Sequence, residues 1–351
     1  MNNSIEIRNR KVGEGSPVWI IAELSANHNQ DFDQAVQLIK VAKEAGADAI
    51  KIQTYTPDTM TIDCDNEYFR IGKGTIWEGR TLYDLYREAH TSWEWQPELK
   101  KIASDLGMVL FSTPFDKTAV DFLEKMDVCA YKIASFELVD IPLIQYVAQT
   151  GKPIIMSTGM ASLAEIDEAV TAAREVDCKE IALLKCTSAY PASPDEMNLR
   201  TIPHLAQTFG LPVGLSDHSL RIAAPVAAVA LGAHLIEKHL TLSRATQGPD
   251  SAFSLEPDEF KAMVEEIRVT EESLGEVNYI ATDKEAASRA FRRSLFVLRD
   301  MKAGDTFTEH NVRSIRPCHG LHPRFLAEVM GAKASRDISK GTPLRWELVA
   351  R

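Results

Sequence analysis

The sequence predicts a closed barrel of eight parallel strands and eight helices, the (β/α)8 or TIM-barrel fold, followed by a small β-rich domain. Apolar runs of strand length alternate with stretches of helical spacing through residues 1–275. A polar cluster follows almost every run, and in such barrels the active site lies at the carboxyl ends of the strands. The eight predicted strands are residues 18–24, 49–55, 109–115, 130–136, 153–159, 181–188, 211–215 and 235–240.

Helical spacing fills most of the intervals between these runs. Residues 33–46 place alanine, leucine and isoleucine on one stripe and end at a glycine, and residues 257–274 predict the last barrel helix. Residues 56–92 break the pattern, and the next regular helix is predicted to begin only near Trp95. This segment is too long for a simple connection. Its aromatic and arginine content favours a lid over the substrate rather than a surface excursion.

The chain changes character after the barrel. The polar residues 276–289 predict a linker between a barrel domain, residues 1–275, and a small domain, residues 290–351. Two near-copies of one turn lie in the small domain, Arg299-Asp-Met-Lys-Ala-Gly304 and Arg336-Asp-Ile-Ser-Lys-Gly341. Short strands are predicted beside them at 293–298 and 344–349, and a polar loop between the turns carries Arg316.

Composition restricts the partners and the compartment. The 39 Lys and Arg against 50 Asp and Glu give a net charge of −11, which argues against nucleic acid and anionic membranes as partners. An anionic substrate must therefore be held by a local group of cations. Five cysteines without paired spacing, no signal region and no membrane-spanning run predict a soluble protein with reduced thiols in the cytoplasm.

Two strand ends carry the pattern of a metal site. His218 follows the run 211–215 and His239 lies in the run 235–240, and each has a carboxylate beside it, Asp217 and Glu237. Neighbouring parallel strands lie about 4.8 Å apart, so side chains at their ends converge. A single histidine could simply cap a strand and bond a backbone carbonyl. Two at matching positions favour a divalent metal, which imidazole suits.

Lysines within apolar strands need an anion, because burying an unpaired charge is costly. Lys51 and Lys132 either pair internally with Glu23 and Glu137 or meet an anionic ligand. The two are compatible, because the internal pairs can form while no ligand is bound. Strict alternation places Lys132 and Ser135 on opposite faces, so that strand must end or bulge between them. Hydroxyls at neighbouring strand ends complete a cradle for a phosphate and a carboxylate. They are Thr113, Ser135, Ser157 and Ser216.

The remaining candidates concern proton transfer and sugar binding. Glu23 and Glu137 are the candidate acid and base groups, because a carboxylate in a dry pocket can titrate near neutral pH. Their alternative role is structural pairing with the lysines. Asn27, Tyr190 and Asp250 are candidate ligands for the hydroxyl groups of a sugar, although Tyr190 beside Pro191 could also serve only in packing.

Ordered motifs cover the chain from end to end. They are Ala22-Glu23-x-x-x-Asn27-His28-Asn29, Lys51-x-Gln53, Ser112-Thr-Pro-Phe-Asp116, Tyr131-Lys132-Ile-x-Ser135-x-Glu137, Ser157-Thr-Gly-Met160, Ser216-Asp-His218, Ile236-Glu-Lys-His239 and Gly248-Pro-Asp250. With the C-terminal region, which resembles an antifreeze-like (SAF) domain, this set resembles the sialic acid synthase family. Members condense phosphoenolpyruvate with an N-acetylated hexose to give a nine-carbon acid and phosphate.

The resemblance implies roles for individual residues. His218 and His239 would hold a divalent metal, manganese or magnesium, with cobalt as a third option. Members are typically domain-swapped homodimers, in which Arg316 of one subunit would reach the N-acetyl group of the sugar in the other. Phosphoenolpyruvate would be held by Lys51, Thr113, Lys132, Ser135, Ser157 and Ser216. The sugar would face Glu137, Gln53, Tyr190 and Asp250.

Within the family, residues 22–28, 74–86 and 248–254 resemble the branch that uses 2,4-diacetamido-2,4,6-trideoxy-L-altrose. The branch that uses N-acetylmannosamine usually has an asparagine where this chain has Ser188. A sugar with a second acetamido group and a deoxy methyl favours apolar contacts, which Trp77, Tyr83 and Tyr86 could supply.

Three other readings remain open. The neuraminate and legionaminate branches are the nearest alternative for the sugar. A metal-dependent barrel hydrolase fits less well, because the first strand lacks the His-x-His pair common in those enzymes. A sugar-binding protein without catalysis is disfavoured, because a competent residue occupies every catalytic-type position.

Overall fold

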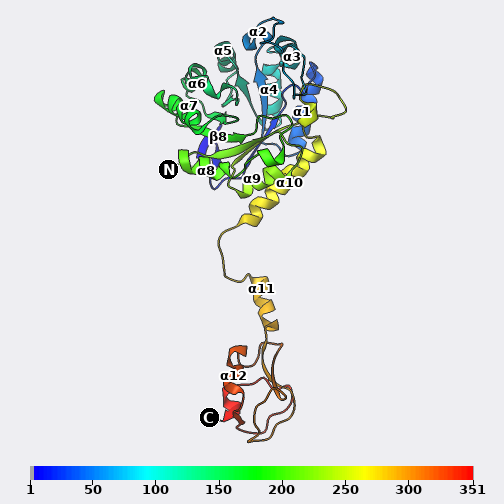
Figure 1. Cartoon of the computed structure of the whole chain (residues 1–351), viewed down its shortest axis with the longest axis vertical. Coiled ribbons are helices and arrows are strands. Elements are labelled where there is room, and N and C mark those ends of the chain that lie inside the picture. The colour runs from blue at the N-terminus through cyan, green and yellow to red at the C-terminus, as the bar shows by residue number, and fades with distance from the viewer. Residues whose placement is uncertain (1–3, 351) are drawn as a thin grey trace. The chain divides into compact units, whose positions relative to one another are not determined.

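Eight parallel strands close into a barrel in the first part of the chain, which confirms the predicted fold (Figure 1). The computed structural model describes residues 4–350 and divides into two units, Met1–Gly275 and Glu276–Arg351. Around the barrel the strand order is β10-β3-β4-β5-β6-β7-β8-β9, so the last strand closes against the first. The strands are β3 (Trp19–Glu23), β4 (Ala49–Thr54), β5 (Val109–Pro114), β6 (Tyr131–Ile133), β7 (Ile154–Ser157), β8 (Ile181–Cys186), β9 (Val213–Asp217) and β10 (Leu235–His239).

Helices cover the outside of the barrel. Side-chain caps fix where several of them begin: Asp31 accepts from the backbone amides of Asp33 and Gln34, and Ser162 forms a capping box with Glu165. The outward side chains of the strands and the apolar stripes of these helices form one large core. The helices are α1 (Phe32–Glu44), α4 (Gln96–Asp105), α5 (Lys117–Lys125), α6 (Ile141–Ala148), α7 (Leu163–Glu175), α8 (Thr201–Phe209), α9 (Ala223–Ala230) and α10 (Pro257–Leu274).

The inward side chains divide into two zones along the strands. Near the amino ends they are apolar and pack in a second core with a hairpin, β1 (Ser4–Ile7) and β2 (Arg10–Gly13). This hairpin was not predicted from the sequence. Near the carboxyl ends the inward side chains are polar and line a cavity. Members of the apolar zone are Ile5, Ile7, Val12, Trp19, Ile21, Ala49, Phe111, Ala130, Ile155, Ala182, Leu184 and Leu235.

Residues 56–92 contain two helices, α2 (Pro57–Met60) and α3 (Leu82–Ala89). The prediction that no regular helix begins before Trp95 was therefore wrong. The hydroxyl of Thr81 caps α3 by accepting from the amide of Asp84. Leu82, Leu85 and Tyr86 lie on one stripe of α3, and this stripe faces the cavity instead of the helical core.

The second unit is a small domain with its own apolar core. Its strands are short: β11 (Ser294–Val297) pairs with β12 (Val312–Ile315), and β13 (Lys333–Ala334) pairs with β14 (Val349–Ala350). The two similar turns meet, because Met301 bridges to Ile338 and the Lys302 ammonium contacts the Asp337 carboxylate at 2.7 Å. Gly304 and Gly341 occupy equivalent left-handed positions, with φ of 86° and 84°.

Two details of this unit differ from the predictions. Residues 344–349 do not form a strand, because a short 3-10 turn, Trp346–Leu348, precedes the two-residue β14. The predicted linker at residues 276–289 contains a helix, α11 (Asp283–Ser288), and the domain also has a one-turn helix, α12 (Leu326–Val329).

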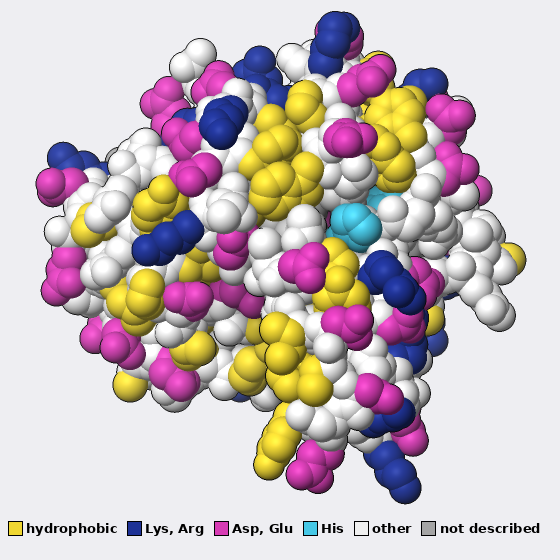
Figure 2. Space-filling model, turned by 90° about the horizontal axis from the view of Figure 1, so that it is seen from above, with side chains coloured by type: hydrophobic (Ala, Val, Ile, Leu, Met, Phe, Trp, Pro, Cys, Tyr) yellow, Lys and Arg dark blue, Asp and Glu magenta, His cyan; other side chains and the backbone are white. Residues whose placement is uncertain are grey.

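The surface carries charged side chains of both signs, as the 39 Lys and Arg and 50 Asp and Glu of the sequence lead one to expect. On the face that Figure 2 shows, acidic and basic side chains are interspersed and the apolar side chains form separate patches. All five cysteines are free thiols. Within residues 4–350, no helix combines the length and the apolar character that crossing a membrane would require.

Candidate active site

A cavity of about 460 Å³ opens at the carboxyl ends of the barrel strands. Its walls come from the strand ends, from residues 56–92 and from the loop after β10. The cavity brings together all but three of the site residues that the sequence analysis selected. Those that line it are Glu23, Lys51, Gln53, Lys132, Ser135, Glu137, Ser157, Tyr190, Ser216, His218, His239 and Asp250.

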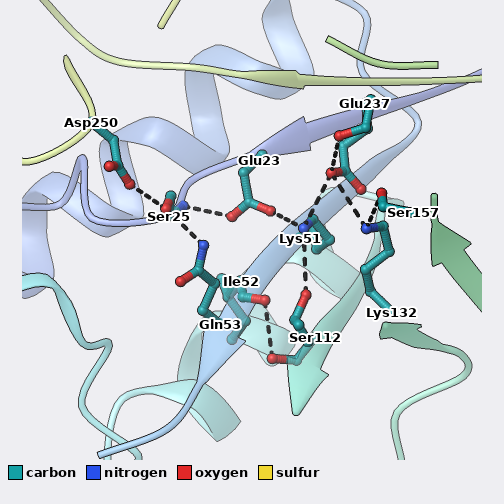
Figure 3. Close-up of polar contacts among 12 residues, drawn as sticks. Glu23, Ser25, Lys51, Ile52, Gln53, Ser112, Lys132, Ser157, Glu237 and Asp250 are labelled. Atoms are coloured by element: carbon teal, nitrogen blue, oxygen red, sulfur yellow. Dashed lines mark hydrogen bonds and ion pairs between the residues drawn. The ribbon is translucent and has the colours of Figure 1, made fainter. Parts of the chain in front are cut away.

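A buried network of charges forms the floor of this cavity (Figure 3). The Lys51 ammonium forms an ion pair with Glu23 and lies 3.3 Å from Oε1 of Glu237. The Lys132 ammonium donates to the Ser157 hydroxyl at 2.6 Å and lies 3.9 Å from the same Glu237 oxygen. Glu237 thus bridges the two lysines. The alternative in which Lys132 pairs with Glu137 does not hold in the structure, because the Glu237 carboxylate from β10 faces Lys132 instead.

Burial shifts the charge state of this network. It lowers the pKa of Lys132 to about 8, and the carboxylate of Glu237 opposes that change. For Lys51, burial also acts to lower the pKa, but Glu23 and Glu237 outweigh it, so the pKa is raised. The neighbouring carboxylates therefore compensate the charge of Lys132 less fully than that of Lys51. An anion that binds in the cavity would therefore gain more binding free energy from an ion pair with Lys132 than from one with Lys51.

Strand β6 ends early, and this explains how Lys132 and Ser135 share one cavity. The strand stops at Ile133, so alternation no longer applies at Ser135. The Ser135 hydroxyl bonds that of Ser188 at 2.8 Å. Gly159 passes so close that an added Cβ would lie 2.3 Å from the Ser135 Cβ, so only glycine fits there. The requirement that the strand end or bulge between the two residues is confirmed.

Glu137 stands apart from the network at the edge of the cavity. Burial raises its pKa to about 7, and its Oε2 has no hydrogen-bond partner within the described chain. A carboxyl group with these properties holds or releases a proton close to neutral pH. Glu23 differs, because it accepts from the Ser25 amide at 2.7 Å and is paired with Lys51.

The two predicted histidines meet at the adjacent ends of β9 and β10. Their ring centroids are 5.3 Å apart. Nδ1 of His218 lies 2.9 Å from the Thr187 carbonyl oxygen, a contact that fits the tautomer in which Nε2 carries a free lone pair. Nδ1 of His239 is buried without a hydrogen-bond partner in the described residues, and burial is the first cause that holds its pKa well below the usual value.

A fully buried ion pair supports both histidines from behind. Asp217 and Lys238 point away from the cavity, one residue before His218 and His239 respectively, and they contact each other. The Lys238 ammonium also donates to the backbone carbonyl of Ser219. The backbone on both sides of His218 is therefore tied to the strand that carries His239.

The donor set suits a divalent ion held by two imidazoles. A backbone carbonyl that fixes one ring nitrogen, as that of Thr187 does for His218, is typical of metal-binding histidine. Within residues 4–350, no group of three or more His, Cys, Asp or Glu could enclose an ion by itself. The protein would supply two ligands, and substrate or water would supply the others.

Three selected residues lie outside the cavity lining. Thr113 is buried in β5, where its hydroxyl accepts from Lys51 at 3.4 Å, so it lies behind the lysine. The Asn27 amide donates to the Leu240 carbonyl at 2.9 Å and to the Ser254 hydroxyl at 2.8 Å, which makes it a tie between loops. Arg316 belongs to the second unit, where it is exposed near Arg292 and Arg293.

The cavity also contains residues that the sequence analysis did not select. Glu237 was noted only as a neighbour of His239, although its place two residues earlier on the same strand predicts that both face inward. Ser25 links Gln53 to Asp250, because its hydroxyl accepts from Gln53 at 2.8 Å and contacts the Asp250 carboxylate. For Cys186, burial acts to raise the pKa, but His218 and Lys132 lower it to about 7.

Comparison with known proteins identifies relatives along the whole chain. The NeuB family model matches residues 38–279 and the SAF domain model matches residues 292–350. The chain is 48% identical to the pseudaminic acid synthase of Campylobacter jejuni over 328 residues, which is 93% of this chain and 95% of that protein. It is 44% identical to the pseudaminic acid synthase of Helicobacter pylori over 336 residues, or 95% and 98%.

A solved structure agrees with these relatives. The crystal structure of an N-acetylneuraminic acid (sialic acid) synthetase from Leptospira borgpetersenii superposes with a TM-score of 0.73 at 33% sequence identity. The match covers 81% of this chain and 94% of that one. Both comparisons thus point to the same group of proteins.

Proposed function

The chain belongs to the NeuB family, and we propose that it condenses phosphoenolpyruvate, 2,4-diacetamido-2,4,6-trideoxy-L-altrose and water to pseudaminic acid and phosphate. It is a transferase that forms a carbon–carbon bond. The observation that carries the proposal is the meeting of Lys51 and Lys132 with the His218 and His239 imidazoles in one cavity. The high identity to two pseudaminic acid synthases supports the choice of sugar.

Phosphoenolpyruvate fits the polar floor of the cavity. Its carboxylate and phosphate need several cations and hydroxyls, and Lys51, Lys132, Ser157, Ser216 and Ser135 offer them within one buried region. The methylene carbon of phosphoenolpyruvate bound there would face the region of the two histidines. The aldehyde of the open-chain sugar would lie there.

The reaction then proceeds by addition and elimination. Carbon 3 of phosphoenolpyruvate attacks the aldehyde carbon, a carbon–carbon bond forms, and the positive charge of an oxocarbenium ion develops on carbon 2. Water adds at carbon 2, and the resulting intermediate expels phosphate by carbon–oxygen cleavage. Glu23, whose carboxylate is buried at the floor, stabilises the positive charge and takes a proton from water. Glu137, protonated near neutral pH, donates to the oxygen that was the aldehyde.

His218 and His239 would hold a divalent ion, manganese or magnesium, and such an ion supplies Lewis-acid polarisation of the aldehyde oxygen. His218→Ala or His239→Ala should abolish Mn²⁺ binding, measured by electron paramagnetic resonance titration, and nearly all turnover. His204→Ala, on the exposed side of α8, is the matched control. Undiminished Mn²⁺ affinity in both active-site variants would contradict this assignment.

The proposed activity is tested directly by phosphate release. The purified protein is presented with phosphoenolpyruvate, Mn²⁺ and one sugar at a time: the trideoxy diacetamido altrose, the precursor of legionaminate, and N-acetylmannosamine. The first should give the highest kcat/KM, and the product should be a nine-carbon acid by mass spectrometry. A preference for either of the other sugars would overturn the choice of branch.

The family resemblance also supports a domain-swapped homodimer in which Arg316 meets the N-acetyl group of the sugar in the other subunit. Arg316→Ala should raise the KM for the sugar and leave phosphoenolpyruvate binding unchanged, while Arg324→Ala, also exposed, should change neither. Mixing Arg316→Ala with inactive Lys132→Met subunits should restore activity, because the intact barrel receives an intact arginine. No restoration after subunit exchange would contradict swapping.

The five free cysteines support a cytoplasmic setting for this enzyme, because reduced thiols persist in that compartment. Fractionation of the source cells, with an assay for the condensing activity in each fraction, tests this part of the proposal. Activity confined to a membrane or secreted fraction would contradict it.

A further inference from the structure

One side of the cavity is apolar, and the mechanism above does not use it. We call this side the apolar wall and define it as Met60, Ile71, Leu82, Leu85 and Tyr86, all from residues 56–92. Leu85 is buried and the other four are half-buried. Half-buried apolar side chains that line a cavity lose further contact with water when a ligand with apolar groups covers them, and this favours binding of that ligand.

The wall lies farther out than the charged floor. On β4 the inward side chains follow one another as Lys51 and Gln53, and Tyr55 follows directly after the strand. Because a strand advances about 3.3 Å per residue, Gln53 lies roughly 7 Å and Tyr55 roughly 13 Å beyond Lys51. The ring of Tyr55 packs against Tyr86 of the wall with centroids 5.8 Å apart. From the floor to the mouth of the cavity, the charged Lys51 is thus followed by the amide of Gln53 and then by the apolar wall beside Tyr55.

An open-chain sugar matches this order. Its aldehyde, carbon 1, must lie at the floor beside phosphoenolpyruvate, so its far end, carbon 6, points outward. Gln53 follows Lys51 on the way outward, and Ser25 connects it to Asp250. These two side chains are therefore available to the polar groups in the middle of the sugar. The far end then meets the wall. Ile71, Leu82 and Leu85 carry no group that could bond a hydroxyl, and the Met60 thioether is only a weak acceptor.

The wall is held in place before any substrate arrives. The indole Nε1 of Trp77 donates to the Pro249 carbonyl at 2.9 Å, beside Asp250. At the end of the segment, the ring of His28 bonds the Thr91 hydroxyl at 3.1 Å, and the Gln30 amide donates to the Glu88 carbonyl at 2.9 Å. These ties join residues 56–92 to two different barrel loops. A fixed apolar surface discriminates better than one that must first become ordered.

We propose that the apolar wall is the subsite for the methyl-bearing carbon 6 of a 6-deoxy sugar, and that it selects against sugars with a hydroxyl at this position. The inference rests on the proposed function and adds the residues that determine specificity. A hydroxyl placed against Ile71, Leu82 and Leu85 would lose its hydrogen bonds to water without replacement. An apolar pocket rejects a substrate that merely adds a hydroxyl by up to about 100-fold, and this sets the expected size of the effect.

The part of the segment outside the cavity supplies matched controls. Ile71 lines the cavity, whereas Ile76, five residues further along, is 47% exposed and does not line it. Tyr83, which the sequence analysis grouped with Trp77 and Tyr86, donates its hydroxyl to Asp58 at 3.1 Å and does not line the cavity. The same substitution at Ile71 and at Ile76 therefore separates the subsite from a general effect on the segment.

The experiment compares two sugars that differ only at carbon 6. Phosphate release is measured with the full-length protein, phosphoenolpyruvate and Mn²⁺, using the 6-deoxy diacetamido altrose and its synthetic analogue with a 6-hydroxyl. The wild-type ratio of kcat/KM should favour the deoxy sugar by about 10- to 100-fold. Ile71→Asn and Leu82→Gln should each reduce that ratio by about 10-fold with the KM for phosphoenolpyruvate unchanged, and Ile76→Asn should leave it intact.

The outcomes separate the two proposals. An unchanged ratio in a folded Ile71→Asn or Leu82→Gln variant overturns the role of the wall while the proposed function stands. The second variant keeps the test decisive if the first does not fold. Absence of phosphate release from the wild type with both sugars overturns the proposed function, and the role of the wall with it.

Discussion

The two ends of the barrel interior are built from the same strands and have opposite properties. On β3 the inward residues are Trp19 and Ile21 at one end and Glu23 at the other, and on β10 Leu235 precedes Glu237. The change from a closed apolar core to a buried charge takes two residues, roughly 7 Å of strand. Because the strands are continuous, the apolar end holds the backbone on which the charges sit.

This contrast shows how the fold tolerates charges that do not favour folding. Buried ion pairs contribute little or even cost stability, because each ion loses its hydration. The apolar end, with the stacked rings of Trp19 and Phe111 at 5.6 Å, contributes hydrophobic burial instead. We therefore expect substitutions at one end to change activity and at the other to change stability.

The largest expected effect is the loss of activity in Lys132→Met. The ammonium of Lys132 is the least neutralised cation of the floor, so kcat/KM for phosphoenolpyruvate should fall by about 1000-fold. The free energy of unfolding should fall by less than about 3–5 kcal/mol, the cost of losing one partner of an isolated buried ion pair, because Glu237 keeps Lys51 as a partner. Urea unfolding and initial rates measure the two quantities.

Lys261→Met, on the exposed side of α10, is the control for that experiment. If Lys132→Met lost several kcal/mol of stability and still bound phosphoenolpyruvate normally in calorimetry, the lysine would be structural. Lys132 would then contradict the expectation that substitutions at the polar end change activity rather than stability.

At the apolar end, Phe111→Ala should reduce the free energy of unfolding by about 3–5 kcal/mol, because a fully buried ring leaves a cavity. Phe111 is two residues before Thr113 on the same strand, so a shift of the backbone could reach Lys51. We nevertheless expect the KM for phosphoenolpyruvate to stay within about two-fold at temperatures where the variant is folded. A larger rise would show that the two ends are coupled.

The sequence predicted the polar end better than the apolar end. Lys51, Lys132, His218 and His239 were recognised because charged residues in apolar runs are rare, and the positions follow from strand alternation. The hairpin that closes the apolar end was missed, because its strands have four residues each and apolar residues of that kind occur in any loop.

Two other features needed the three-dimensional structure. Glu237 meets Lys132 only across the barrel interior, and the order of residues along the chain contains no sign of that contact. The stripe of Leu82, Leu85 and Tyr86 has ordinary helical spacing, which predicts a face toward a core. The stripe instead faces the cavity, in a segment that hydrogen bonds at Trp77 and Thr91 join to loops far away in the sequence.

A smaller effect is expected from Glu137→Gln, through pH. The carboxyl has a pKa of about 7 in the folded protein against 4.5 as the ordinary value, so the folded state binds its proton more tightly. The stability that this proton contributes is complete below pH 4.5 and is lost as the pH rises to about 7. Relative to the glutamine variant, the wild type should lose about 1–3 kcal/mol over this range.

Urea unfolding of both proteins at pH 5 and pH 8 measures this difference. A constant difference between wild type and Glu137→Gln would show that the carboxyl is solvated in the folded protein. It would then have no advantage as a proton donor near neutral pH, and its assignment in the mechanism would fall.

The smallest effect is expected at the hairpin that closes the apolar end. Val12 is fully buried and pairs with Ile5, and Val12→Ala removes two methyl groups, so unfolding should become easier by about 1–2 kcal/mol. The loss is smaller than for Phe111 because fewer atoms are removed and a two-stranded hairpin can settle into the space. Residues in one packed cluster are coupled, so the effects of Val12→Ala and Phe111→Ala should not add. The kcat and both KM values should match the wild type, and a fall in kcat in the folded variant would show that the hairpin does more than close the barrel.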